Sequence, residues 1–121
     1  LKSSCREIRL LELPPLSQWS DQYEPACRLF HSSLDHDPRF RALSYVWGDQ
    51  TDQRIIKVNG CTFKVNQNLF GALMGIVRSK TIVIWIDAIC INQKDDEEKG
   101  WQVAMMGDIY RKASKVFAWL G

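Results

Sequence analysis

Short blocks of apolar residues separated by polar turns run through the chain and predict a series of β-strands. The most distinctive block, residues 82–86 (IVIWI), is apolar at every position and mostly β-branched. A run of this kind is too short to span a membrane and is typical of a strand buried on both faces of a parallel sheet. The remaining predicted strands cover residues 7–13, 26–31, 41–47, 55–58, 61–65 and 115–120, and the buried strand covers 81–86.

Asn59-Gly60 joins two of these strands and predicts a β-hairpin. The pair suits a type I′ turn because both central residues of that turn need a positive φ. In the resulting register Val58 faces Cys61. The hairpin is therefore expected to carry one apolar face, made of Ile56, Val58, Cys61, Phe63 and Val65.

Two helices are predicted by apolar residues at helical spacing that follow N-capping residues. Asn66 is a suitable N-cap for a helix ending near Arg78. Its expected core stripe is Leu69, Phe70, Leu73, Met74, Ile76 and Val77. Asp95 caps the second helix, and Glu98 three residues later completes a capping-box pattern. The expected core positions of this second helix are Trp101, Met105, Ile109 and Ala113, and Met106 and Tyr110 widen this face.

The order of these elements predicts an α/β fold with a parallel-sheet core. Strands and helices alternate over residues 41–120, which is typical of parallel strands joined by crossovers. We expect the strands at 7–13 and 26–31 to pair antiparallel at the edge of the domain, with the hairpin as an insertion. Because the chain stops where a strand finishes, we expect it to be a piece whose later elements lie beyond Gly121.

Length and composition indicate one compact domain with neither nucleic acid nor membrane as a partner. The chain has 121 residues, 45% of them apolar, and a net charge of +2. Basic and acidic residues are interspersed, and no segment has the length and apolar character of a membrane span. The four cysteines are scattered without a C-x-x-C pair, so no metal site is expected. This cysteine usage favours a reduced, cytoplasmic protein.

Polar residues follow the buried strand where it ends, and this is where a ligand site is expected. Open α/β sheets bind their ligands outside the carboxyl ends of the strands. Asp87 comes directly after the apolar run, and Asn92 and Gln93 follow closely. A purely structural interpretation also exists, in which Asp87 is a strand end facing water and the two amides cap backbone groups before the next helix. The pattern alone leaves both interpretations open.

Four motifs in the chain resemble the HET (heterokaryon incompatibility) domain. They are residues 42–48 (ALSYVWG), 85–93 (WIDAICINQ), 102–110 (QVAMMGDIY) and 119–121 (WLG). The resemblance covers nearly the whole chain and implies that residues 1–121 form the N-terminal portion of such a domain. HET domains occur mostly in fungal proteins that detect non-self after cell fusion and trigger programmed cell death. The implied partners are other copies of the chain and other domains of incompatibility proteins.

The resemblance also implies a distant relation to TIR domains, and with it a flavodoxin-like fold. Some TIR domains hydrolyse NAD with a glutamate on a later helix, so NAD is the substrate that the resemblance suggests. The corresponding family motif lies beyond Gly121, so no catalytic residue is assigned. Three functions stay open: an NAD-cleaving enzyme, a self-associating signalling module without chemistry, and a nucleotide-binding sensor.

The residues expected to bind a nucleotide come from the ends of two predicted parallel strands. They are Ser44, Tyr45, Trp47, Gly48, Asp87, Asn92 and Gln93. Tyr45 or Trp47 could stack on a base or a nicotinamide ring, and Gly48 would permit close approach of the backbone. Asp87 could accept hydrogen bonds from ribose hydroxyls. The alternative interpretation makes the two aromatic residues part of the core and Gly48 a simple turn.

Overall fold

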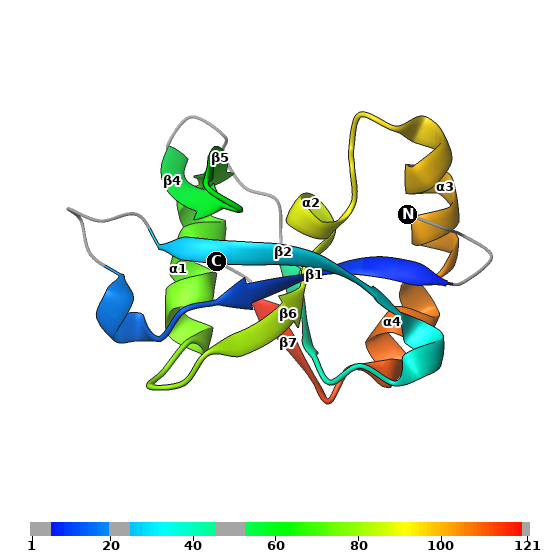
Figure 1. Cartoon of the computed structure of the whole chain (residues 1–121), viewed down its shortest axis with the longest axis horizontal. Helices are drawn as coiled ribbons and strands as arrows, with labels where there is room; N and C mark the ends of the chain where they lie inside the picture. The colour runs from blue at the N-terminus through cyan, green and yellow to red at the C-terminus, as the bar shows by residue number, and fades with distance from the viewer. Residues whose placement is uncertain (1–5, 20–24, 46–52, 120–121) are drawn as a thin grey trace.

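The computed structural model describes residues 6–19, 25–45 and 53–119, and it contains one mixed sheet covered by helices (Figure 1). Within these residues the strand order is β5-β4-β2-β1-β6-β3-β7. The strands are β1 Glu7–Leu13, β2 Ala26–Ser33, β3 Arg41–Tyr45, β4 Gln53–Val58, β5 Cys61–Asn66, β6 Ile82–Trp85 and β7 Lys115–Trp119. The helices are α1 Gln67–Ile76, α2 Asp87–Cys90, α3 Asp96–Ala104 and α4 Met106–Lys112, with 3₁₀ turns at Leu16–Gln18 and Leu34–His36.

The predicted parallel pairing is confirmed for three strands. β3 lies between β6 and β7 and runs parallel to both. Ala42 pairs with Trp85 on one side and with Val116 on the other. Ile84, Trp85 and the following Ile86 are fully buried, as expected for a strand with protein on both faces. The sheet as a whole is mixed, so the parallel part is smaller than the sequence alone suggested.

The antiparallel pairing of β1 and β2 is confirmed, but their expected position at the edge is wrong. β1 also pairs antiparallel with β6, through Leu11 and Ile84, so it lies near the middle of the sheet. The physical reason is that β1 places apolar residues on both faces. Leu10 and Leu11 point to opposite faces of a strand, and both are buried. Burial on both faces is typical of a strand inside a covered sheet.

The hairpin is confirmed in its predicted register, with Val58 opposite Cys61. Asn59 and Gly60 both have positive φ, as a type I′ turn requires. The expected burial of Cys61 is wrong, because this residue lies at the exposed tip where no other element covers it. The hairpin extends the sheet because the end of β4 pairs parallel with the start of β2.

The first helix begins as predicted, since Asn66 accepts a hydrogen bond from the Leu69 N–H at 2.7 Å. It ends at Ile76, two residues before the expected end, and Met74 of the predicted stripe is exposed. The expected single second helix is wrong. Met105, with ψ of −3°, separates α3 from α4, because α3 is held on β1 by polar side chains whereas α4 packs its Tyr110 against Trp85 of β6.

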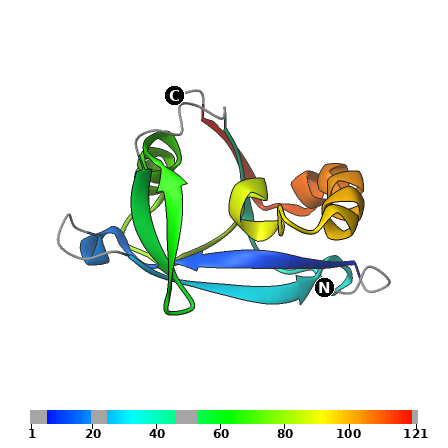
Figure 2. The ribbon, with the colours of Figure 1, turned by 90° about the horizontal axis from the view of Figure 1, so that it is seen from above.

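The helices cover different sides of the curved sheet. Figure 2 shows α1 on one side of β3 and β7, and α2, α3 and α4 on the other. The core between these layers is built mainly from leucine and isoleucine. Its fully buried members include Ile8, Leu10, Leu11, Leu13, Leu34, Ile56, Leu73, Ile84, Trp85 and Ile109. None of the helices in the described ranges has the length and apolar character needed to cross a membrane.

Candidate functional site at the carboxyl ends of the parallel strands

Asp87 occupies the first position of α2, directly beyond the end of β6. The chain leaves the strand at Ile86, whose carbonyl oxygen accepts the N–H of Cys90 at 2.8 Å. This short helix was not predicted, because a single turn of four residues carries no periodic signal. It holds the Asp87 carboxyl half-buried instead of letting it extend into water as a strand end would.

Three side chains from three elements meet at this edge: Ser44 from β3, Asp87 from α2 and Tyr110 from α4. The Ser44 side chain and the Asp87 carboxylate both lie close enough to Tyr110 to act on the pKa of its phenol. The predicted adjacency of β3 and β6 is confirmed by their parallel pairing, which places Ser44 and Asp87 at the same edge of the sheet. Tyr110 was expected only as a core-facing helix residue.

Burial dominates the electrostatics of this group. Loss of solvent raises the pKa of Asp87 above its usual value, and the backbone N–H groups of Ala88 and of Asp87 itself partly oppose this rise. The pKa of Tyr110 is also raised, first by burial and then by the Asp87 carboxylate, while the Ser44 side chain opposes the change. Among the described residues no ion pair is formed by Asp87, and a desolvated carboxyl of this kind is typical of candidate functional sites.

Tyr110 is held in place by the core residue beside it. Its ring packs edge-on against Trp85, with 5.7 Å between ring centroids and an interplanar angle of 86°. This T-shaped contact is a favourable arrangement for two aromatic rings. The Trp85 indole N–H is buried and has no hydrogen-bond partner among the described residues. This contact positions the Tyr110 ring beside the end of β6.

Asn92 and Gln93 make local hydrogen bonds in the loop after α2. The Asn92 Oδ1 accepts the N–H of Lys94 at 3.1 Å, and the Gln93 Nε2 donates to the carbonyl oxygen of Asp87 at 2.8 Å. Both side chains are exposed. These bonds match the structural interpretation that the sequence left open, and Gln93 additionally fixes the backbone of the residue that bears the candidate carboxylate.

A second polar group, which the sequence did not indicate, supports the same loop. Arg9 of β1 and Glu98 of α3 form two parallel hydrogen bonds of 2.7 Å each. Glu98 Oε2 also accepts the Asn92 N–H at 2.8 Å, and Arg9 donates to the Cys90 carbonyl at 3.3 Å. The expected capping box is therefore only half correct. Asp95 caps the Glu98 N–H, but the Glu98 side chain accepts hydrogen bonds from Arg9 and from the Asn92 N–H instead.

The remaining predicted site residues follow Ser44 in the chain. Tyr45 is the last residue of β3, and its side chain lies outside the described part of the structure. Trp47 and Gly48 also lie outside the described residues. Their proposed stacking and close-approach roles stay predictions.

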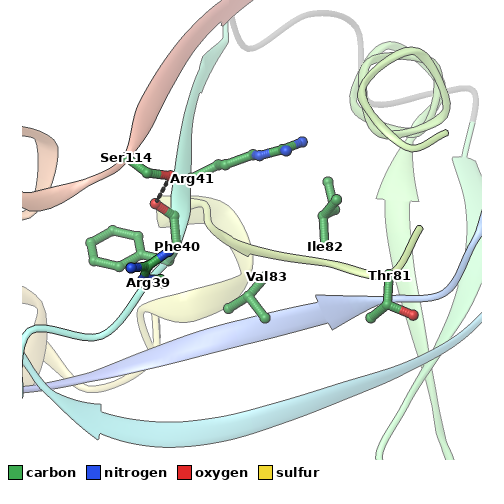
Figure 3. Close-up of a pocket in the computed structure, with 7 residues that line it drawn as sticks. All are labelled: Arg39, Phe40, Arg41, Thr81, Ile82, Val83 and Ser114. Atoms are coloured by element: carbon green, nitrogen blue, oxygen red, sulfur yellow. Dashed lines mark hydrogen bonds between the residues drawn. The ribbon is translucent and has the colours of Figure 1, made fainter. Parts of the chain in front are cut away.

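A cavity of about 190 Å³ lies at the opposite edge of the parallel strands (Figure 3). It is lined by Arg39, Phe40, Arg41, Thr81, Ile82, Val83 and Ser114. These residues belong to the beginnings of β3 and β6 and to the turn before β7, whereas Ser44 and Asp87 belong to the ends of the strands. The cavity and the candidate site are therefore separate features.

Fold and motifs together define an α/β domain of the heterokaryon-incompatibility type. Residues 40–121 match the family Heterokaryon incompatibility protein (HET), and this protein belongs to that family. It is similar to the Heterokaryon incompatibility protein 6, OR allele, of Neurospora crassa, with 37% identity over 136 aligned residues that include the whole of this chain. The chain spans about a fifth (20%) of the length of this relative. No solved structure matches the chain.

Proposed function

We propose that this HET domain is an intracellular effector of programmed cell death in fungal non-self recognition, and that it acts on a nucleotide bound at the edge formed by Ser44, Asp87 and Tyr110. The observation that carries the proposal is the meeting of these three polar side chains at the carboxyl ends of two adjacent parallel strands. This is the usual position of a ligand in an open α/β sheet. The similarity to an incompatibility protein supports the biological role.

The strand order supports a flavodoxin-like, TIR-like core. In chain order the parallel strands are β3, β6 and β7, and in space β3 lies between the other two. This arrangement matches the beginning of the 2-1-3-4-5 order of flavodoxin-like sheets, which bind their ligand where the connections change direction. That point lies beside β3, the strand that ends in Ser44 and Tyr45.

NAD is the substrate that this proposal favours. The half-buried Asp87 carboxylate would accept hydrogen bonds from ribose hydroxyls, and Tyr110 and Ser44 would supply hydroxyl groups beside it. Release of nicotinamide passes through an oxocarbenium-like transition state, which a nearby carboxylate stabilises, as in glycoside hydrolysis. By analogy with TIR domains, a glutamate in a later segment would supply that carboxylate. The described residues would then bind and orient the nucleotide.

Self-association is the second candidate function, in which the domain would act as a signalling module without chemistry. Assembly and catalysis are compatible if the assembly completes the site.

The experiment that tests the enzyme proposal is release of nicotinamide from NAD by a protein extended to the length of the Neurospora relative, measured beside the 121-residue chain. Turnover in the extended protein, reduced by substitution of Asp87, would support the proposal. No turnover at concentrations where the extended protein assembles would reject the enzyme and favour the self-associating module.

Asp87→Asn tests the binding site directly. We expect NAD affinity to fall about tenfold, equivalent to ~1.4 kcal/mol, because one charged acceptor is lost. Stability at pH 7 should not fall. Burial raises the pKa of Asp87, so its ionised form costs folding free energy once the pH rises above that raised value, and the neutral amide removes this cost.

Calorimetric titration with NAD and urea unfolding would measure both effects, with Asp96→Asn as the matched control on an exposed aspartate. Unchanged NAD affinity in Asp87→Asn would remove this residue from the site. A loss of stability above about 1 kcal/mol would make the role of Asp87 structural.

A further inference from the structure

The three parallel strands begin at an edge rich in basic residues, and the neighbouring Glu12 of β1, the register partner of Val83, is ion-paired with Arg28 at 3.1 Å. The segments that form this edge and the strands behind it, residues 38–45, 77–86 and 113–119, contain no Asp or Glu. Basic side chains occur at the start of each strand: Arg39 and Arg41 at β3, Lys80 before β6, and Lys115 at β7. Two acidic residues directly adjoin these segments in sequence: Asp37 is paired with Lys112 at 3.0 Å, and Asp87 lies at the opposite ends of the strands.

Two of these charges are forced together by the sheet. Arg41 and Lys115 are register partners in the parallel pair of β3 and β7, so their side chains leave the same face of neighbouring strands. Like charges in adjacent positions repel each other and destabilise a sheet. A bound anion would remove this repulsion.

The cavity of about 190 Å³ lies in the middle of this basic edge. Figure 3 shows the Arg41 side chain extending from β3 towards Ile82, with Thr81 on the far side of Ile82. The Ser114 hydroxyl donates to the Phe40 carbonyl oxygen at 3.0 Å, which fixes the turn before β7. The apolar side chains that line the cavity are Phe40, Ile82 and Val83. Arg39, Arg41 and Thr81 add two guanidinium groups and a hydroxyl.

The arginines at this cavity differ from most others in the chain. Four of the other six arginines in the described ranges are paired with carboxylates, namely Arg6, Arg9, Arg28 and Arg111, whereas the exposed Arg78 has no such partner among the described residues. Arg54 instead lies 4.3 Å from the ring centroid of Phe70. Arg39 and Arg41 have no hydrogen-bond or ion-pair partner among the described residues. Their donors are thus available to a ligand.

We infer that this edge binds a phosphate group, which Arg41 would hold at the cavity and which the exposed side chains of Arg39 and Thr81 would reach by reorienting. The planar donor fork of arginine matches phosphate oxygens, and Lys80 and Lys115 add the charge that favours a dianion over a carboxylate. The cavity is smaller than the roughly 300–1,000 Å³ of typical small-molecule sites, so it suits one or two phosphate groups and not a whole nucleotide. It lies at the opposite ends of the strands from Asp87.

Titration with inorganic phosphate and with pyrophosphate, at constant ionic strength and followed by amide NMR shifts, tests this site. We expect saturable binding, with the largest shifts at residues 39–41 and 81–83. The double variant Arg39→Gln/Arg41→Gln should weaken binding at least tenfold, whereas Lys64→Gln, on an exposed lysine of the hairpin, should leave it unchanged. Tighter binding of pyrophosphate would identify a diphosphate ligand, and equal binding would identify a single phosphate group.

Two further variants keep the test decisive. Arg39→Gln alone changes an exposed side chain and should weaken binding severalfold without affecting the fold. Arg41→Lys keeps the charge but loses the fork, and it should also weaken binding severalfold. Shifts that do not saturate, or that Lys64→Gln reduces as much as the arginine variants do, would overturn the proposal. Phosphate binding should be unaffected by Asp87→Asn, so the outcome is independent of the nucleotide proposal.

Discussion

At the scale of single residues, the most consequential polar side chains are those whose partners are distant in sequence. Glu98 is held by Arg9, 89 positions earlier in the chain, and only 7% of its side-chain surface is exposed. Gln102, which is fully buried, donates to the Glu7 carbonyl oxygen at 2.8 Å. These two side chains fasten α3 to β1 and position the loop after Asp87.

Glu98→Gln is expected to destabilise the domain by about 2 kcal/mol, because it leaves the Arg9 guanidinium without its charged partner. Urea unfolding at pH 7 would measure the loss. Glu97→Gln is the matched control, since Glu97 is exposed on the same helical turn, and it should change stability by less than about 0.5 kcal/mol. Equal effects of the two substitutions would contradict the assigned role of the ion pair.

The same ion pair predicts a dependence of stability on pH. The hydrogen bonds from Arg9 hold the pKa of Glu98 below its usual value of 4.5. A carboxylate with a lowered pKa in the folded state stabilises the protein fully above its unfolded-state pKa and loses that contribution as the pH falls through the folded-state value. The difference in stability between the parent protein and Glu98→Gln should therefore shrink from about pH 4.5 downward.

At the scale of elements, the turns do more than reverse the chain. The Asn59 side chain accepts the Leu29 N–H at 2.9 Å and donates to the Leu29 carbonyl oxygen at 3.0 Å. The Asn59 N–H donates in addition to Cys27. One turn residue therefore continues the short parallel pairing of β2 with β4 and attaches the hairpin to the sheet.

Asn59→Gly separates the two roles of this residue. Glycine accepts the positive φ of 51° without strain but loses both side-chain hydrogen bonds to β2. We expect a loss of about 1 kcal/mol in thermal or urea unfolding, because these bonds are exposed. Asn59→Asp keeps the acceptor and loses the donor, so its stability should lie between that of the parent protein and that of Asn59→Gly. A glycine variant as stable as the parent would show that only the turn conformation matters.

At the scale of the whole molecule, the three thiols within the described residues fall into two classes by burial. Cys61 is exposed at the hairpin tip, while Cys27 and Cys90 are buried. Burial raises the pKa of both buried thiols to about 12. Cys90 lies next to Asp87 in the fold but is protonated at neutral pH, so it has no nucleophilic role at the candidate site.

Alkylation with iodoacetamide at pH 8, followed by peptide mapping, should therefore label Cys61 rapidly. Cys27 and Cys90 should react only through opening of the sheet, at rates that rise steeply with urea concentration. Labelling of Cys90 at the same rate as Cys61 in native buffer would contradict the packing around β6 and α2.

The sequence by itself determined the local elements. The positive φ preference of Asn59-Gly60 defined the hairpin, the Asn66 side chain defined the start of α1, and the apolar run at 82–86 defined a buried strand. Each of these follows from interactions within a few residues. The motifs also indicated the HET family, and the strand–helix alternation placed Ser44 and Asp87 at the ends of two strands.

Only the tertiary structure decided which elements become neighbours. In the structure β1 lies near the middle of the sheet and not at its edge, and the second helix is divided at Met105. The Glu98 side chain binds Arg9 and not the end of its own helix. The tertiary structure also brought Tyr110 to Ser44 and Asp87, and it gathered Arg39 and Arg41 around a cavity. These features rest on contacts between residues far apart in sequence, whose energies depend on packing and desolvation that no local pattern records.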